Sequence, residues 1–324
     1  MGNLKSSVKI GGHITLIFEI KALSENLDEQ GSRGVGICIN KGVRIETFAK
    51  KGSGEITIDS NQKNVSIKLY KLIIKEVSKK FQNIEKYDWH FKIESDLPFG
   101  QGFGCSASGA ISAAISILKI LNKKENIYED SVSIAHRVER LFSSGLGDVT
   151  GISAGGVELR TKPGLPFTPN NGLVLSWFED FPILLCWMND EEKHTSEYIN
   201  SDKWISRINS AGKECLNILN NKAWNKDIWS DILDQSKKFG EMSGMIKDIN
   251  RRNLTLKLEE ILMNKDLQSS WEIRLCMLGT SAIVLPKNLK NYNKEDLYLI
   301  MQDLSKMDLV GCLTSVNNNP IDCD

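Results

Sequence analysis

The sequence predicts an α+β protein built from two lobes. Short segments of apolar and β-branched residues between glycines characterise the first half of the chain, and long amphipathic helices characterise the second. Strands and helices are mixed without the strict alternation of a parallel sheet. At 324 residues, the chain is long enough for one large domain or two domains of ordinary size.

The first elements are predicted from two kinds of periodicity. Segments 13–20 and 34–50 are rich in β-branched residues between glycines, which is typical of strands. Apolar residues then recur at helical spacing over 65–77. Segment 87–95 alternates apolar and polar side chains, as a half-buried strand does.

A glycine-rich segment, 96–110, connects this strand to the next helix. Apolar residues at helical spacing continue from Ala107 to Leu121. A second helix is predicted over roughly 130–142, and a strand over 155–162. Asp148 falls in the predicted loop between them.

The best candidate for a domain boundary is the segment 162–172, which holds three of the seven prolines. It predicts an N-terminal domain at 1–168 and a C-terminal domain at 169–324. Beyond it we expect a strand at 184–188, long amphipathic helices and another strand at 276–285.

Composition limits the classes of partner. Lysine plus arginine equals aspartate plus glutamate at 41 each, so no net field recruits nucleic acid or a membrane surface, and neither is expected as a partner. The seven cysteines never form a CxxC pair, which favours reduced thiols over disulfides or a structural zinc site. The N-terminus lacks a signal-peptide pattern and no apolar run approaches membrane-spanning length, so we expect a cytoplasmic protein.

The segment "DLPFGQGFGCSASGA" (96–110) is the main functional candidate. Its glycines are misplaced for the dinucleotide pattern GxGxxG, and it lacks the lysine of a Walker A loop. What remains is a glycine loop before a helix, where free backbone amides and the positive dipole end favour a phosphate. From these residues alone, a phosphate-binding loop and a structural turn that caps the helix are about equally supported.

The pattern P-x-x-x-G-x-G-x-S-A, from Pro98 to Ala107, resembles the second motif of the GHMP kinases, a family of small-molecule kinases. Phe103 and Cys105 stand where the usual form has leucine and serine. Within this family the chain most resembles the pantoate kinases of archaeal coenzyme A synthesis. The segments behind that narrower resemblance are "GHITLIFEI", "GSRGVGICINKGV", "HRVE", "GLGDVTGISAGGVELRTKPG" and, in the second half, "MLGTSA".

This resemblance implies the two-lobed GHMP kinase fold, with an N-terminal lobe like domain 2 of ribosomal protein S5 and an α+β C-terminal lobe. It implies ATP as the phosphoryl donor, Mg²⁺ as a cofactor and pantoate as the small-molecule substrate. The nucleotide-binding residues that it implies are Pro98, Gly100, Gly102, Gly104, Cys105, Ser106, Ala107 and Ser108.

The resemblance also implies roles for acidic residues. Ser106 and Glu139 would hold Mg²⁺, and Asp148 would be the catalytic residue at the acceptor hydroxyl. Taken alone, Glu139 is better interpreted as an ion-pair partner on a solvated helix face, and Asp148 as a turn residue. Only the motif context favours function for both.

Pantoate carries one carboxylate and two hydroxyls, so its site needs a cation and polar groups. Arg160 can bind a carboxylate with two parallel hydrogen bonds. His136, Ser32 and Thr195 are further implied substrate contacts. His13 follows two glycines where many relatives have Pro-Gly-His, and the sequence leaves packing and binding equally open for it.

We therefore expect transfer of the γ-phosphoryl group of Mg·ATP to the primary hydroxyl of pantoate, giving 4-phosphopantoate for coenzyme A biosynthesis. One alternative is a GHMP kinase for another small alcohol, such as homoserine, mevalonate or shikimate. Another is a non-catalytic nucleotide-binding regulator of the same fold. The sequence is compatible with a homodimer, although no motif predicts one.

Overall fold

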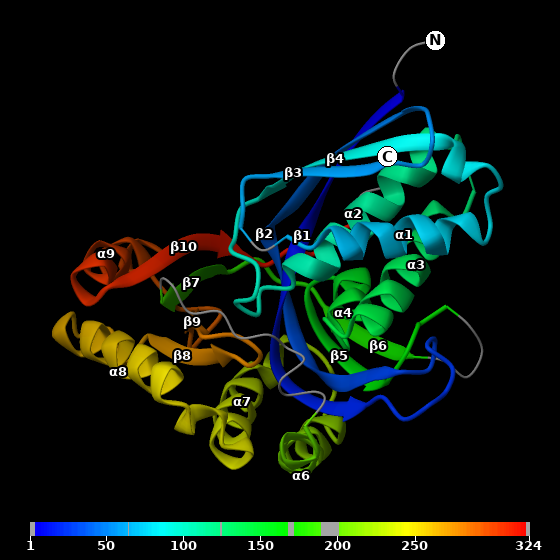
Figure 1. Cartoon of the computed structure of the whole chain (residues 1–324). Coiled ribbons are helices and arrows are strands. Elements are labelled where there is room, and N and C mark those ends of the chain that lie inside the picture. Colours follow the sequence, from blue (N-terminus) through cyan, green and yellow to red (C-terminus); the bar gives the residue numbers. More distant parts are fainter. Residues whose placement is uncertain (1–3, 64, 124, 168–171, 189–200, 322–324) are drawn as a thin grey trace.

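Two β-sheets and the helices packed on them form the molecule (Figure 1). The computed structural model describes residues 4–63, 65–123, 125–167, 172–188 and 201–321. In these residues the strands are β1 (Leu4–Lys21), β2 (Gly31–Lys51), β3 (Ile56–Ser60), β4 (Tyr87–Ser95), β5 (Val157–Lys162), β6 (Leu173–Trp177), β7 (Pro182–Met188), β8 (Trp271–Cys276), β9 (Ser281–Pro286) and β10 (Leu309–Ser315). The α-helices are α1 (Ile67–Ser78), α2 (Cys105–Ile120), α3 (Ile127–Phe142), α4 (Asp148–Ala154), α6 (Asp202–Asn220), α7 (Trp229–Ser243), α8 (Ile249–Asn264) and α9 (Glu295–Leu304).

The first sheet has the strand order β3-β4-β2-β5-β6, with β1 paired to β2. Only β3 and β4 run parallel; the other neighbours are antiparallel. β1 and β2 form a long hairpin whose register shifts between Gly11 and Gly12 and again between Thr15 and Ile17. Such bulges re-aim the side chains beside them. His13, between the two shifts, is therefore free to point away from the regular pleat.

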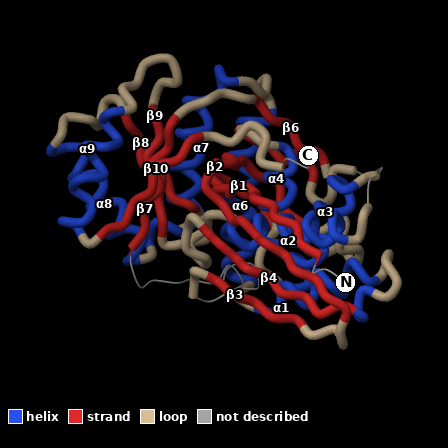
Figure 2. Tube along the Cα trace, turned by 90° about the horizontal axis from the view of Figure 1, so that it is seen from above, coloured by secondary structure: helices blue, strands red, loops and turns tan. Residues whose placement is uncertain are grey.

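Helices cover one face of this sheet, because α2 packs on β1 and β2 and α3 packs on α2 (Figure 1). The second sheet is antiparallel, with the order β10-β7-β9-β8, and α8 and α9 pack on it (Figure 2). The far end of β1 contacts α6, α7 and β8, so the long hairpin joins the two parts of the molecule. No helix among the described residues is both long and apolar enough to cross a membrane.

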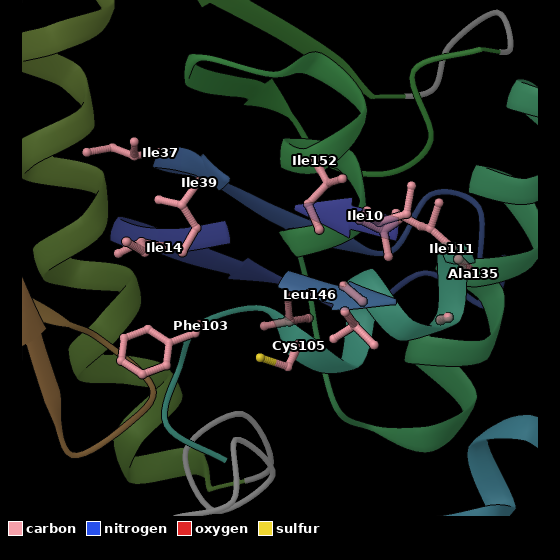
Figure 3. Packing of buried hydrophobic residues seen from close by; sticks show 14 of the residues in the cluster. Ile10, Ile14, Ile37, Ile39, Phe103, Cys105, Ile111, Ala135, Leu146 and Ile152 are labelled. Carbon is pink, nitrogen blue, oxygen red and sulfur yellow. The ribbon is translucent and has the colours of Figure 1, made fainter. Parts of the chain in front are cut away.

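The glycine segment is anchored in the core by two side chains. Phe103 and Cys105 both point into the apolar cluster that fills the space between β1, β2 and α2 (Figure 3). Phe103 also stacks edge-on against Trp187, with ring centroids 5.6 Å apart. Burial of a large apolar side chain contributes about 1.5–3 kcal/mol. The loop is therefore held in the fold by these two buried side chains.

The predicted α+β class is confirmed, and most predicted elements are present. The strand predicted at 276–285 is wrong in part, because β8 ends at Cys276 and β9 begins at Ser281. Gly279 lies in the turn between them, where an added Cβ would be 2.1 Å from the carbonyl oxygen of Gln101, so this turn packs directly on the glycine segment. Asp148, expected in a loop, is the first residue of α4.

The strands β3 and β6 were not predicted, since both are short and carry few of the usual strand signals. β6 pairs with β5 and so belongs to the first sheet. The boundary predicted between residues 168 and 169 lies outside the described residues and stays a prediction.

Candidate active site

The glycine segment forms a backbone loop in front of α2. Gly100, Gly102 and Gly104 all have left-handed φ angles, of 80°, 77° and 68°, which only glycine adopts at little cost. α2 begins at Cys105, directly after Gly104, and no side chain caps its N-terminus. The first amides of a helix have no partner within the helix. The loop thus presents amides and a positive helix end to an anion.

Hydrogen bonds from distant elements fix this loop. The backbone N–H of His13 donates to the carbonyl of Phe103 over 3.1 Å. The hydroxyl of Ser281 donates to the carbonyl of Gln101. The hydroxyl of Ser108 donates to the carbonyl of Gly11 over 2.7 Å. The loop is therefore clamped between β1 and the β8–β9 turn, and the Ser108 hydroxyl already has a partner in the fold.

The loop and two acidic residues line one small pocket of about 60 Å³. Its walls come from β1, the loop, α2, α3 and the segment after it, the start of α4 and the β8–β9 turn. The lining residues are Thr15, Pro98, Gly100, Gly102, Phe103, Gly104, Cys105, Ser106, Ala107, Glu139, Ser144, Asp148 and Leu278. The structure thus brings together most residues of the predicted nucleotide, metal and catalytic sets.

Glu139 is buried beside two hydroxyl groups. Its Oε1 accepts hydrogen bonds from Ser106 over 2.5 Å and from Ser144 over 2.7 Å. Burial raises the pKa of Glu139 to about 7, and the negative charge of Asp148 adds to this, against the two hydroxyl hydrogen bonds, which lower it. A carboxylate with such a pKa would be favoured in its charged form by a nearby cation.

The carboxylates of Glu139 and Asp148 both lie close to Gly145. A Cβ added at Gly145 would lie 2.1 Å from Oε2 of Glu139 and 3.1 Å from Oδ2 of Asp148. A side chain at position 145 would therefore collide with the carboxylate of Glu139 and crowd that of Asp148. Among the described residues no cluster of three or more His, Cys, Asp and Glu side chains could hold a metal ion. The oxygen donors of Ser106 and Glu139 nevertheless fit Mg²⁺, which is commonly bound by one or two protein ligands with water and phosphate.

Asp148 belongs to a chain of buried polar groups. Its Oδ1 lies 2.8 Å from Nδ1 of His13, and Nε2 of His13 lies 3.0 Å from Oε1 of Glu158. Glu158 also accepts a hydrogen bond from Nη1 of Arg160. His13, Glu158 and Arg160 are almost completely buried, whereas the side chain of Asp148 is 17% exposed at the pocket.

The hydrogen bonds and charges within this group of buried side chains determine the pKa values of His13 and Asp148. Burial alone would lower the pKa of His13, but its hydrogen bonds to Asp148 and Glu158 outweigh burial and raise it. Burial alone would raise the pKa of Asp148, but the hydrogen bond and charge of His13, with the charge of Arg160, lower it. Asp148 is therefore held as a carboxylate, and an imidazolium at His13 would donate to both acids.

A second polar group, Ser32 with Arg160, lies next to Asp148. An added Cβ at Gly147 would be 2.2 Å from Oγ of Ser32 and 2.6 Å from Nε of Arg160. Nε of Arg160 is buried and has no hydrogen-bond partner among the described residues. A buried donor of this kind costs free energy unless something binds it.

His136 lies one helical turn before Glu139 and is buried. Its Nε2 is 2.9 Å from the carbonyl of Leu27, so this nitrogen carries the proton. Burial lowers the pKa of His136 to about 4. His136 is therefore neutral and holds the β1–β2 connection. Thr195, another predicted substrate contact, lies outside the described residues.

Sequence reasoning missed three of these residues. The role of His13 was left open, and Glu158 and Ser144 were not singled out. Glu158 and Arg160 alternate with the apolar Val157 and Leu159 in β5, which puts both charged side chains on one face of the strand, and this alternation is the available signal. Nothing in the sequence indicates that His13 contacts Asp148 and Glu158, which lie 135 and 145 positions further along the chain.

Comparison with known proteins agrees with this geometry. Residues 67–156, from the start of α1 to two residues beyond α4, match the family of GHMP kinases N terminal domain. A pantoate kinase from Methanocaldococcus jannaschii is 37% identical over 208 residues, which are 64% of this chain and 71% of that protein. A pantoate kinase from Thermococcus kodakarensis is 28% identical over 262 residues, 79% of this chain and 81% of that protein.

Solved structures share the fold along almost the whole chain. A phosphotransferase related to the coenzyme A biosynthesis pathway superposes with a TM-score of 0.73 at 22% identity, covering 97% of this chain and 96% of that one. A mevalonate kinase from Methanococcus jannaschii superposes with a TM-score of 0.61 at 18% identity, covering 96% and 98%. Fold and site together define the class of small-molecule kinases. The chain belongs to the GHMP kinase superfamily and, within it, to the family of the pantoate kinases.

Proposed function

We propose that this protein transfers the γ-phosphoryl group of ATP to the primary hydroxyl of pantoate, giving 4-phosphopantoate. The observation that carries the proposal is the meeting of two carboxylates, Glu139 and Asp148, with the uncapped N-terminus of α2 in one pocket. Phosphoryl transfer needs amides or cations for the phosphates, an oxygen ligand for a metal and a group at the acceptor hydroxyl. The curated relatives named as pantoate kinases supply the substrate.

The ATP phosphates would lie against the loop from Pro98 to Ser108. The three left-handed glycines let phosphate oxygens reach main-chain amides without a Cβ in the way. The amides of the first turn of α2 add the positive end of the helix dipole. Cys105 takes part only through its backbone in this proposal, because its thiol is buried and burial raises its pKa to about 12.

Ser106 and Glu139 would hold Mg²⁺. Their oxygens already lie 2.5 Å apart, and both are hard ligands of the kind that Mg²⁺ prefers. When bound, the ion would neutralise phosphate charge during transfer. Ser144, which also hydrogen-bonds to Glu139, would keep the carboxylate in this orientation.

Asp148 would orient the acceptor hydroxyl and take its proton as the bond to phosphorus forms. His13 would act as a positioning residue, since it holds one oxygen of Asp148 and leaves the other, Oδ2, on the side of Gly145 and Glu139. The low pKa of Asp148 keeps it ready to accept a hydrogen bond from an alcohol.

The carboxylate of pantoate would bind Arg160 and Ser32. The partnerless Nε of Arg160 supports this assignment, because a carboxylate would satisfy it. His136, neutral and with Nε2 engaged by Leu27, would offer Nδ1 as an acceptor to a substrate hydroxyl. A contact with Thr195 remains part of the proposal from family resemblance alone.

The test is a panel of acceptors in a coupled assay of ADP release with Mg·ATP. Pantoate should exceed homoserine, mevalonate and shikimate in kcat/KM by at least about a hundredfold, since a site built around buried polar groups rejects acceptors that leave them unpaired. Phosphorus NMR of the product should show a monoester on the primary hydroxyl. A different preferred alcohol would overturn the substrate, and absence of ADP release with all four would favour a nucleotide-binding regulator.

A further inference from the structure

The connection between β1 and β2, residues 22–30, is a turn at the end of the long hairpin (Figure 1). Its own side chains fix its shape. The side-chain amide of Gln30 donates to the carbonyl of Ser24 over 2.7 Å, and the hydroxyl of Ser24 donates to the carboxylate of Glu29 over 2.8 Å. We call these residues the 22–30 turn. It leads, through one glycine, into Ser32, a proposed contact of pantoate.

An ion pair attaches the 22–30 turn to α3. Nε and Nη2 of Arg137 both donate to the carboxylate of Asp28, each over 2.6 Å. Two parallel bonds between an arginine and a carboxylate fix orientation as well as distance. The hydrogen bond from Arg137 lowers the pKa of Asp28 against the effect of burial, so the pair is charged at neutral pH. The side chains are 30% and 19% exposed, so solvent screens the pair only in part.

The ion pair lies beside a second proposed contact of pantoate. His136 precedes Arg137 in α3. Its Nε2 donates to the carbonyl of Leu27, which precedes Asp28 in the turn. Only Nδ1 of His136 is then left for a substrate hydroxyl. The ion pair therefore keeps Leu27 in place for His136, and through this bond it sets the orientation of the imidazole ring.

Directly after the turn, the backbone packs against the residues that precede Asp148. A Cβ added at Gly31 would lie 3.1 Å from the carbonyl oxygen of Leu146. A Cβ added at Gly147 would lie 2.2 Å from Oγ of Ser32. These short approaches place the Ser32 hydroxyl next to the start of α4. A displacement of the turn would thus move this hydroxyl relative to Asp148.

The main chain of Asp28 connects the turn to a further segment. Its carbonyl accepts a hydrogen bond from the backbone N–H of Leu165 over 2.9 Å, shortly after β5, the strand that carries Arg160. A Cβ added at Gly164 would lie 2.4 Å from the same carbonyl oxygen. The hydroxyl of Thr150 in α4 donates to the carbonyl of Gly164 over 3.2 Å. Asp28 therefore links α3, through its carboxylate, to the segment after β5, through its carbonyl.

We propose that Asp28 and Arg137 are positioning residues for pantoate. They hold the 22–30 turn, which sets the Ser32 hydroxyl and the His136 ring. This role rests on the proposed function, since it concerns how the acceptor of that reaction is bound. Among the described residues that line the pocket at the glycine segment, none belongs to the turn. Loss of the ion pair should therefore weaken binding of the acceptor and leave binding of ATP almost unchanged.

Steady-state kinetics of Asp28→Asn, Arg137→Gln and the double variant test this role. Each single variant should raise KM for pantoate about tenfold, keep KM for ATP within about twofold and lower kcat less than about threefold. The double variant should be no more than about threefold worse than either single variant, because both substitutions remove the same interaction. Arg137→Lys keeps the charge and one hydrogen bond, so its KM should lie between those of wild type and Arg137→Gln.

The matched control is Asp130→Asn, in the first turn of the same helix. Asp130 pairs with Lys80 over 2.5 Å and with Lys123 over 2.7 Å, and both lysines lie outside the 22–30 turn. This variant should lower the urea midpoint of unfolding by about as much as Asp28→Asn, yet keep KM for pantoate at the wild-type value. The control separates a loosened α3 from a displaced turn.

The outcomes distinguish this role from the proposed function. A wild type that prefers another alcohol contradicts only the proposed substrate, because KM is then measured for that alcohol. A wild type that releases no ADP with any acceptor overturns both. With an active wild type, the positioning role is overturned by unchanged acceptor KM in Asp28→Asn and Arg137→Gln, by an equal rise in Asp130→Asn, by an equal rise of KM for ATP, or by effects that multiply in the double variant.

Discussion

Arg160 in β5 and Arg274 in β8 are both buried strand residues, but their guanidinium groups have different surroundings. Arg274 donates to the carbonyls of Leu233 and Ile273 and to the carboxylate of Glu272. Arg160 donates to Glu158, and its Nε has no partner among the described residues. The backbone satisfies one arginine, and the other keeps a donor for something outside the chain.

The difference extends to the regions around them. Near Arg160, the buried groups are side chains brought together from distant segments: His13, Glu158 and Asp148. Near Arg274, the partners are the adjacent strand residues Glu272 and Ile273 and the backbone carbonyl of Leu233 in α7. A buried arginine with a structural role, such as Arg274, donates its hydrogen bonds to carbonyls of the fold. A buried arginine at a binding site, such as Arg160, keeps a donor without a partner among the described residues.

The largest expected effect is on kcat. It should follow a substitution in the pocket and be absent for an acidic residue elsewhere in the first sheet. Asp148→Asn should lower kcat by at least about a hundredfold, because the amide cannot take the proton of the acceptor, while ATP binding changes little. Steady-state kinetics and calorimetric titration with a non-hydrolysable ATP analogue measure the two quantities. Asp59→Asn, at an exposed position in β3, is the control and should behave as wild type. Undiminished turnover in Asp148→Asn would refute the catalytic role.

His136 extends this comparison, because the residue lies next to the candidate active site while its Nε2 hydrogen-bonds to a backbone carbonyl of the fold. Its folded pKa of about 4 is below the ordinary value of 6.5. The unfolded chain therefore binds a proton that the folded chain does not, so stability falls as the pH drops from about 6.5 toward 4. At pH 5 the loss should be about 2 kcal/mol. Glu139, whose pKa is raised to about 7, acts in the opposite direction over this range, so the quantity to measure is the difference between wild type and His136→Asn. In urea unfolding, the free energy of unfolding of wild type should fall by about 2 kcal/mol relative to that of His136→Asn between pH 7 and pH 5.

The exposed His90 on β4 provides the control for that measurement. His90→Asn should keep the full pH dependence of wild type, because the ring of His90 is 38% exposed. Equal pH dependence in His136→Asn and wild type would show that the histidine is not held neutral by the fold.

Matched lysine substitutions test the two arginines directly. Arg160→Lys keeps a positive charge beside Glu158 but removes the Nε donor, so KM for pantoate should rise about tenfold with little loss of stability. Arg274→Lys should leave the kinetics unchanged and lower the free energy of unfolding by about 1–2 kcal/mol, because the Leu233 carbonyl loses its donor. Steady-state kinetics of both variants measure KM for pantoate, and urea unfolding measures the free energy of unfolding. The comparison fails if Arg274→Lys is the variant that changes KM.

The sequence predicts the fold class and the phosphate-facing segment well, because both depend on local patterns. The glycine spacing before α2 and the alternation in β4 are visible within a few residues. The polar chain from Asp148 through His13 to Glu158 was not predicted. It depends on the pairing of β1, β2 and β5 and on the register shifts around His13, and no local pattern determines these. The split of 276–285 into two strands likewise depends on the glycine segment packing against Gly279.

His13 gives the smallest and most specific prediction. In His13→Asn, Asp148 loses both a hydrogen bond and a positive charge, so burial prevails and its pKa rises. The acidic limb of the pH profile of kcat should move up by about one pH unit, and kcat at pH 7 should fall about fivefold. The shift of the acidic limb is more informative than the fall in kcat, because a variant with a loosened fold would lose activity equally at every pH. If the profiles of His13→Asn and wild type differ only by a constant factor, His13 supports the packing of β1 and not the charge of Asp148, and the polar chain then resembles the surroundings of Arg274.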